Sequence, residues 1–555
     1  MVLLAALVAT AGAGLCARQP VRSRHGMVAT REAHATDIGL AVLESGGNAI
    51  DAAVAVGFAL AVTHPAAGNI GGGGFLLARF ADGRTTFIDF RERAPEQASR
   101  NMYIGPDGKA GADSVVGYRA SGVPGTVRGL ELAHQKYGRK RWAELLDPAV
   151  RLAANGFPVS YGLAHSLHSP YTSDRLGRFP DSKRIFLKGG KFYEAGERLV
   201  QPELARTLER IRDRGAKDFY EGETAELLAA DMKEHGGLVT QQDLRSYRAI
   251  ERVPLRGSYR GYSIVTAPPP SSGGVGILQM LGVLEGSGYE KPGFGSAAAV
   301  HFLAETMRRY FADRSEYMGD PDFYHVPVAG LLNPRYIAER RQSIDAEHAT
   351  PSTLLHPGKV AAFESSDTTH YSIVDAEGNA VAVTYTLNNG YGSAVTAGKL
   401  GFLLNDEMDD FAAKPGEPNL FGLIQGEANA IQPRKTPLSS MTPTIVLRDG
   451  KLCLVVGSPG GPTIINTVLE VVVNVIDFGM NISDAVDAPR LHHQWMPDVL
   501  RVERGFSPDT VALLRSRGHT VEMEDGQGEV AAIQIQDGWL EGDADPRTEG
   551  TARGY

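Results

Sequence analysis

The chain has 555 residues and a mass of 59.4 kDa, which exceeds a single typical domain and allows a large buried core. Its formal net charge is −9 and it has no long basic block, which disfavours nucleic acid and anionic membranes as partners. Its two cysteines, Cys16 and Cys453, provide neither a disulfide framework nor the spacing of a metal site.

The chain opens with the apolar run MVLLAALVATAGAGLCA, which is typical of the central region of a secretory signal. The run is short for a membrane span and has no positive residue at its start. A lipoprotein anchor through Cys16 is disfavoured by the bulky Leu15 before it. We therefore expect residues 1–24 to be a signal segment and the protein to be periplasmic or secreted.

Residues 36–62 predict two helices separated at residues 45–48, where Ser-Gly-Gly-Asn is typical of a helix end. We expect Thr36 or Asp37 to cap the first helix. The second helix is rich in alanine and valine and should lie in the core.

A glycine-rich loop at residues 68–74 precedes a predicted strand at 75–80. A dinucleotide-binding loop has the opposite order, because it follows a strand and opens a helix. The glycines therefore indicate close backbone packing. The partner strand, residues 85–90, ends directly before Arg91.

Residues 126–243 predict a mainly helical scaffold, and residues 296–317 another helix. Between them lies the rigid turn PPPSSGG, whose serines, Ser271 and Ser272, either cap the next helix or line a pocket. Residues 346–367 are looser and polar, as expected for a surface tail.

Residues 370–375 and 380–387 predict a β-hairpin around the turn Ala-Glu-Gly-Asn, with Thr368 just before its first strand. The second strand has one bulky face and one small face, which leaves room for a ligand. The bulky face carries Val381, Val383, Tyr385 and Leu387, and the small face carries Ala380, Ala382, Thr384 and Thr386.

The rest of the chain predicts a long irregular segment at 414–434, a strand at 451–456 and a helix at 463–478. The irregular segment is a candidate lid over a site. A second hairpin is expected at residues 520–535. Strands and helices mix throughout, which is consistent with two sheets packed between helix layers.

A threonine at the head of a strand has two interpretations. It can be an ordinary β-branched strand residue. If the peptide bond before it is cut, its new α-amino group, with a pKa near ~8, can act as base for its own hydroxyl. Thr368 would then supply the nucleophile and the base together.

The run TTHYSIVDAEGNAVAVTYTLN, followed by NDEMDDF, PLSSMTPTIV and GSPGG, resembles the γ-glutamyltranspeptidases. The likeness extends upstream through NIGGGGF, IDFRERAP, PPPSSGG and ADRSEYMGDPDF. It implies an α+β fold, a four-layer αββα sandwich of the N-terminal-nucleophile hydrolase type. It also implies self-cleavage between Asp367 and Thr368 into a large subunit, residues 25–367, and a small subunit, residues 368–555.

The same resemblance assigns site residues by their place in these motifs. The nucleophile falls on Thr368, a threonine hydrogen-bonded to it on Thr386, and the oxyanion-stabilising N–H groups on Gly460 and Gly461. The substrate-binding residues fall on Arg91, Ser439 and Ser440 for an α-carboxylate, and on Asn388, Glu407 and Asp410 for an α-ammonium group. These residue types suit an amino-acid ligand, because arginine grips a carboxylate with two hydrogen bonds and carboxylates hold an ammonium group.

The implied reaction transfers the γ-glutamyl group of glutathione or a related compound to Thr368, then to water or to an amino acid or peptide. It requires no metal or organic cofactor. One departure is Phe421 in the candidate lid, where such proteins often carry tyrosine. Glu407 is no departure, because family members carry Gln or Glu there.

Four alternatives remain to be weighed. A cephalosporin acylase would have no α-ammonium group to bind, and a poly-γ-glutamate depolymerase fits poorly with a long lid segment. An uncleaved amino-acid-binding or scaffold protein would stay in one piece. A serine hydrolase at Ser458 is disfavoured, because Pro459 disrupts the G-x-S-x-G pattern.

Overall fold

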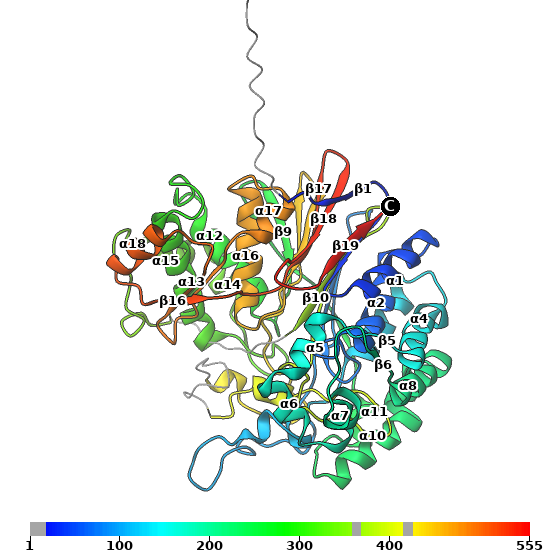
Figure 1. Cartoon of the computed structure of the whole chain (residues 1–555). Helices are drawn as coiled ribbons and strands as arrows, with labels where there is room; N and C mark the ends of the chain where they lie inside the picture. The colour runs from blue at the N-terminus through cyan, green and yellow to red at the C-terminus, as the bar shows by residue number, and fades with distance from the viewer. Residues whose placement is uncertain (1–17, 358–367, 415–425) are drawn as a thin grey trace, which may run out of the picture.

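The computed structural model describes residues 18–357, 368–414 and 426–555. Its centre consists of two seven-stranded antiparallel sheets that pack face to face, with β10 and β11 of one sheet against β13 and β17 of the other. Helices cover the outer face of each sheet (Figure 1). This arrangement confirms the predicted four-layer αββα sandwich.

The sheet that contains the predicted hairpin is called the hairpin sheet, and the other is called the second sheet. The order of the hairpin sheet is β19 (Thr551–Gly554), β2 (Met27–Thr30), β10 (Thr369–Val374), β11 (Ala380–Thr386), β3 (Gly73–Arg79), β4 (Thr85–Asp89) and β7 (Ile250–Arg252). The order of the second sheet is β1 (Val21–Ser23), β18 (Trp539–Ala544), β17 (Ala531–Gln536), β13 (Lys451–Gly457), β12 (Thr444–Arg448), β9 (Tyr262–Thr266) and β8 (Leu255–Tyr259).

The helices form two groups on opposite sides of the sheets (Figure 1). The group beside the hairpin sheet includes α1 (Ala33–Glu44), α2 (Ala49–Thr63), α3 (Thr126–Tyr137), α4 (Trp142–Asn155), α7 (Pro180–Phe186), α8 (Pro202–Arg214) and α10 (Glu223–Glu234). The group beside the second sheet includes α12 (Gly273–Leu284), α13 (Ala297–Tyr317), α15 (Pro334–Gln342), α16 (Thr463–Ile476) and α17 (Ile482–Asp487). Within the described ranges, none of the helices combines the length and hydrophobicity that a membrane crossing requires.

The first two helices lie where the sequence predicts them, but the first begins earlier than expected. Glu32 caps α1, because its carboxylate accepts hydrogen bonds from the backbone N–H groups of His34 and Ala35, both at 3.0 Å. The prediction of Thr36 or Asp37 as the cap is therefore wrong. Thr36 is instead buried, with its hydroxyl 2.8 Å from that of Thr30. Every residue of α2 is buried, as predicted.

The hairpin of β10 and β11 is confirmed, with Thr369 opposite Tyr385 and Val374 opposite Ala380. Its bulky face packs in the core beneath α2. Its small face does not face a ligand along most of its length, because Ala380 and Ala382 pack in the core shared with the second sheet. The expected space for a ligand is therefore absent along Ala380 and Ala382 of this face. It remains a prediction only at Thr386, where the strand ends.

The space between the sheets also contains His370, which is 1% exposed. Burial lowers its pKa to about 3, so the ring is neutral at ordinary pH. Its Nδ1 atom lies 2.8 Å from the hydroxyl of Thr384. A Cβ atom at Gly457 would lie 2.3 Å from this ring, so β13 can approach β10 here only with a glycine.

The predicted hairpin at residues 520–535 is wrong. β16 (Val521–Glu524) pairs in parallel with β15 (Leu500–Glu503) in a small separate sheet, whereas β17 pairs with β13 and β18. Two strands that are neighbours in the sequence thus belong to different sheets.

Candidate active site

The edge of the hairpin sheet brings together residues that are far apart in the sequence. Thr386, the last residue of β11, lies opposite Gly73, the first residue of β3. Continuing the β10–β11 register by one residue places Thr368 beside Thr386. The hydroxyl of Thr386 accepts a hydrogen bond of 2.8 Å from the backbone N–H of Asn388. The two threonines expected to act together are therefore neighbours.

Thr368 also faces the predicted oxyanion turn. It lines a cavity of about 300 Å³ whose other walls are Pro459, Gly460, Gly526, Gly528, Glu529 and Arg547. The turn joins β13 to α16, and its two glycines have φ angles of +126° at Gly460 and +61° at Gly461. A Cβ atom at Gly460 would lie 2.4 Å from the hydroxyl oxygen of Thr463, so this turn requires a glycine.

Arg91 lies at the centre of a buried charged cluster. Its side chain is 2% exposed and forms ion pairs with Glu407 and Asp410. Its Nη2 atom also donates to the carbonyl of Leu438 at 3.0 Å. The structure therefore brings Arg91, expected to bind a carboxylate, together with Glu407 and Asp410, expected to bind an ammonium group, although they come from two distant segments of the chain.

Two residues that the sequence analysis missed hold the backbone of Arg91. Asp89 accepts a hydrogen bond of 3.0 Å from the Arg91 N–H, and it also forms an ion pair of 2.7 Å with Arg252. The hydroxyl of Tyr247 donates to the Arg91 carbonyl at 2.8 Å. The motif IDFRERAP contains Asp89, but nothing in the sequence near Tyr247 signals this contact.

The segment with Ser439 and Ser440 is fastened to the turn before α12. Ser439 N–H donates to the Pro270 carbonyl at 2.8 Å, and Ser272 N–H donates to the Ser439 carbonyl at 2.7 Å. Arg314 donates to the hydroxyl of Ser440 at 3.4 Å. Both serines are buried. They lie beside the Arg91 cluster, because Leu438, the residue before Ser439, accepts a hydrogen bond from Arg91.

Helix capping by Ser271 and Ser272 is confirmed only in part, because Ser272 directly precedes α12 but its side chain makes no capping hydrogen bond, and a pocket-lining role stays a prediction. The Ser271 hydroxyl accepts from the first N–H of α12, that of Gly273, at 3.0 Å, as a capping residue would. It also donates to the Met441 carbonyl at 2.8 Å. The Ser272 hydroxyl donates to the Ser439 carbonyl at 3.1 Å. These serines therefore position the segment that carries Ser439 and Ser440.

Asn388 connects the threonine pair to the acidic segment. Its backbone has a φ angle of +78°, and its side-chain amide donates to the Asp406 carbonyl at 3.1 Å. Asn429, which the sequence analysis also missed, donates to the Asp410 carbonyl at 2.6 Å and accepts from Leu438 N–H at 3.2 Å. The predicted site residues thus form one connected network.

The candidate lid at residues 414–434 is described only in part, and Phe421 lies outside the described residues. Within the described ranges, no group of three or more His, Cys, Asp and Glu side chains is arranged to hold a metal ion.

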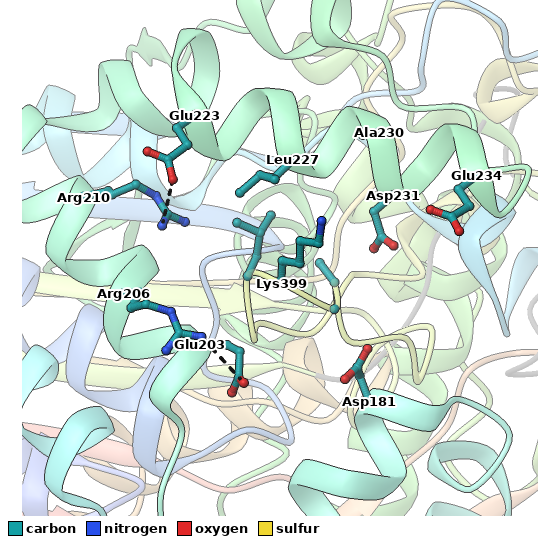
Figure 2. Close-up of a pocket in the computed structure, with 13 residues that line it drawn as sticks. Asp181, Glu203, Arg206, Arg210, Glu223, Leu227, Ala230, Asp231, Glu234 and Lys399 are labelled. Atoms are coloured by element: carbon teal, nitrogen blue, oxygen red, sulfur yellow. Dashed lines mark ion pairs between the residues drawn. The ribbon is translucent and has the colours of Figure 1, made fainter.

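A second cavity, of about 610 Å³, contains none of the predicted site residues. It lies between α7, α8, α10 and residues 397–400 (Figure 2). Figure 2 shows Lys399 pointing toward α10 between Leu227 and Asp231, with ion pairs between Arg210 and Glu223 and between Arg206 and Glu203. This charged cavity lies where helices of the scaffold meet a loop that follows Thr368 in the sequence.

Known proteins resemble this chain in sequence and in fold. The family model described as gamma-glutamyltranspeptidase matches residues 35–555. The glutathione hydrolase proenzyme of Escherichia coli (strain K12) is 52% identical over 531 residues, which cover 95% of this chain and 91% of that relative.

Among solved structures, a cephalosporin acylase from Bacillus halodurans is similar with a TM-score of 0.87 at 28% identity, covering 97% of each chain. The Helicobacter pylori gamma-glutamyltranspeptidase is similar with a TM-score of 0.58 at 45% identity, covering 60% of this chain and 97% of that chain. The family model and the Escherichia coli relative both extend over nearly the whole sequence, and the chain therefore belongs to the γ-glutamyltranspeptidase family.

Proposed function

We propose that the protein is a self-processing γ-glutamyl transferase and hydrolase with Thr368 as its nucleophile. Its precursor would be cut between Asp367 and Thr368 into the large and small subunits. The observation that carries this proposal is the meeting of Thr368 and Gly460 in one cavity, with the Arg91 cluster connected to Thr386 through Asn388.

Processing would use the threonine hydroxyl within the uncut chain. Thr368 Oγ1 attacks the Asp367 carbonyl carbon, the peptide C–N bond breaks, and the Thr368 nitrogen takes up the hydroxyl proton as a free amine. Water then cleaves the resulting ester, which leaves a carboxylate on Asp367 and regenerates the hydroxyl. Thr368 becomes the first residue of the small subunit.

The mature site would repeat this chemistry on a substrate amide. The α-amine of Thr368 takes the hydroxyl proton while Oγ1 attacks the γ-carbonyl carbon, and the leaving amine departs with a proton. Backbone N–H groups at Gly460 and Gly461 would stabilise the oxyanion, and one such donor is typically worth ~3 kcal/mol of the barrier. The γ-glutamyl ester then passes to water or to the amine of an amino acid or peptide.

Substrate recognition would use the Arg91 cluster. The α-carboxylate of the γ-glutamyl group would pair with Arg91, Ser439 and Ser440, and its α-ammonium group with Asn388, Glu407 and Asp410. A zwitterionic amino acid carries one charge of each sign. Its carboxylate can take the place of Glu407 and Asp410 beside Arg91 while its ammonium group pairs with those two carboxylates, so no buried charge is left unpaired.

Two further observations support the proposed subunits. The Escherichia coli relative is a proenzyme, and the Helicobacter pylori chain covers a share of this chain close to that of residues 25–367. The proposed signal segment, residues 1–24, includes β1, which pairs with β18 of the second sheet. A signal cleavage site before Val21 therefore fits the fold better than one after residue 24.

A pair of chromogenic substrates distinguishes this function from that of an acylase. We expect the γ-glutamyl anilide to be cleaved at least ~10²-fold more efficiently than the glutaryl anilide, since each missing charged hydrogen bond costs about 1.5–3 kcal/mol. The assay measures kcat/KM for aniline release from both compounds. Equal or faster cleavage of the glutaryl compound, which keeps the terminal carboxylate but lacks the α-ammonium group, would favour an acylase instead.

A further inference from the structure

Glu92, the residue after Arg91, is a buried carboxyl group to which no role has been assigned above. It is 0% exposed, and neither of its carboxyl oxygens has a hydrogen-bond partner among the described residues. The Oε2 atom of Glu407 is also buried and has no hydrogen-bond partner among the described residues. Buried acceptors without donors are rare and costly, so these three oxygens require an explanation.

The explanation lies in how the two carboxyl groups meet. Glu92 Oε2 and Glu407 Oε1 both approach the Nη1 atom of Arg91, so two carboxyl groups that can only accept hydrogen bonds when ionised lie beside one cation. The backbone closes in on Glu92 from two sides: a Cβ atom at Gly73 would lie 2.7 Å from its Oε2, and one at Gly122 would lie 3.2 Å from its Cβ.

The charges around Glu92 do not balance if every acid is ionised. Arg91 approaches Glu92 at 3.7 Å but is also shared with Glu407 and Asp410, so one guanidinium faces three carboxyl groups.

The other nearby cations have their own contacts. Arg93 lies over the ring of Tyr247, Arg314 donates to serine hydroxyls, and Lys435 donates to the carbonyls of Ala428 and Ala430. None of these contacts involves Glu92.

We infer that Glu92 retains its proton at neutral pH, donates it to Glu407, and so acts as a positioning residue for substrate recognition. This single proton gives a hydrogen-bond partner both to a carboxyl oxygen of Glu92 and to Oε2 of Glu407. It also removes the repulsion between two negative charges inside the protein. Burial, followed by the charge of Glu407, raises the pKa of Glu92 well above its ordinary value, and Arg91 opposes this shift.

The consequence for substrate binding rests on the proposed function. A hydrogen bond from Glu92 fixes the Oε2 atom of Glu407 and leaves Oε1 directed at Arg91 or at an incoming ammonium group. It also lowers the negative charge that the α-carboxylate of the substrate meets beside Arg91. Glu92 would therefore act mainly on the KM for γ-glutamyl compounds and little on kcat.

The pH dependence of stability tests the proton directly. An acid with a raised pKa in the folded state binds its proton more tightly when folded, so its contribution to stability is lost as pH rises above the unfolded value, here 4.5. Glu92→Gln cannot titrate. We expect the thermal midpoint of Glu92→Gln, minus that of the wild type, to increase from pH 5 to pH 8. A difference that stays flat or falls over this range would contradict the inference.

Infrared spectroscopy provides a second readout that does not depend on activity. The difference spectrum between wild type and Glu92→Gln at pH 7.5 should contain the band of a protonated carboxyl group. The spectrum of an ionised carboxylate in its place would overturn the proton assignment. If the band is present but the enzyme cleaves no γ-glutamyl substrate, the proposed function fails and the proton assignment stands.

Kinetics of three variants then test the positioning role. Glu92→Gln keeps a hydrogen-bond donor and should keep KM for a γ-glutamyl anilide within about 3-fold, whereas Glu92→Met should raise KM at least 10-fold with little change in kcat. Glu470→Gln is the matched control, because Glu470 is a buried acid of α16 whose pKa burial raises to about 8. It should alter the pH dependence of stability without altering KM. Equal KM values for Glu92→Gln and Glu92→Met would contradict the positioning role.

Discussion

A Thr368→Ala chain should remain a single polypeptide and release no product from γ-glutamyl substrates. The hydroxyl is the attacking atom in both proposed phases, so its removal stops processing and catalysis together. Loss of a side-chain nucleophile costs on the order of 10⁶-fold in kcat in a serine protease, and a similar loss is expected here. Denaturing gel electrophoresis reports the first effect and a γ-glutamyl anilide assay the second.

The neighbouring threonine provides the control for this experiment. Thr369 is fully buried, and its hydroxyl has no hydrogen-bond partner among the described residues. Thr369→Val keeps the shape of the side chain and should be processed normally, since no hydroxyl contact is lost. Cleavage of the Thr368→Ala chain at the same position, or failure of both variants alike, would contradict the assignment of Thr368.

Replacement of Arg91 should have the second large effect, on stability and on substrate binding. Arg91→Gln leaves the buried Glu407 and Asp410 carboxylates without their shared partner, which typically costs 3–5 kcal/mol. It also removes the proposed grip on the substrate α-carboxylate. We expect kcat/KM for γ-glutamyl anilide to fall by roughly 10²–10⁴, because two charged hydrogen bonds of about 1.5–3 kcal/mol each are lost.

Two comparisons separate these effects. Arg91→Lys keeps the charge but not the two-pronged geometry, and should restore part of the stability while KM stays high. Arg84→Gln removes an exposed arginine of the same β3–β4 region, whose side chain is 70% exposed, and should change stability by less than about 0.5 kcal/mol. An Arg91→Gln enzyme with wild-type KM for γ-glutamyl anilide would exclude Arg91 from substrate binding.

Local patterns in the sequence were sufficient for most of the secondary structure. The β10–β11 hairpin and helix α2 follow from short-range periodicity and from turn and cap residues that act within a few positions. The start of α1 was missed because glutamate is not a favoured capping residue, although the Glu32 carboxylate reaches two backbone N–H groups.

Long-range pairing was less predictable. β16 and β17 are consecutive strands with a hairpin-like pattern, but β16 pairs with β15 and β17 with β13 and β18. Which strand a segment pairs with depends on packing across the whole molecule, and a local alternation pattern does not encode it.

In the site, too, local motifs were predictable from the sequence and long-range contacts were not. Motif resemblance identified its residues, but not the ion pairs that join Arg91 to Glu407 and Asp410, because these depend on two distant segments of the chain meeting in space. Asn429 and Tyr247 were missed for a related reason. They act by single hydrogen bonds to backbone groups of site residues, and such contacts leave no pattern in one sequence.

The most direct test of the central assignment is intact mass and N-terminal sequencing of the purified protein. We predict two fragments, the smaller of which begins Thr-Thr-His-Tyr at Thr368. A single uncut chain that also releases no aniline from γ-glutamyl anilide would contradict the account and indicate a binding protein with an inactive version of this fold.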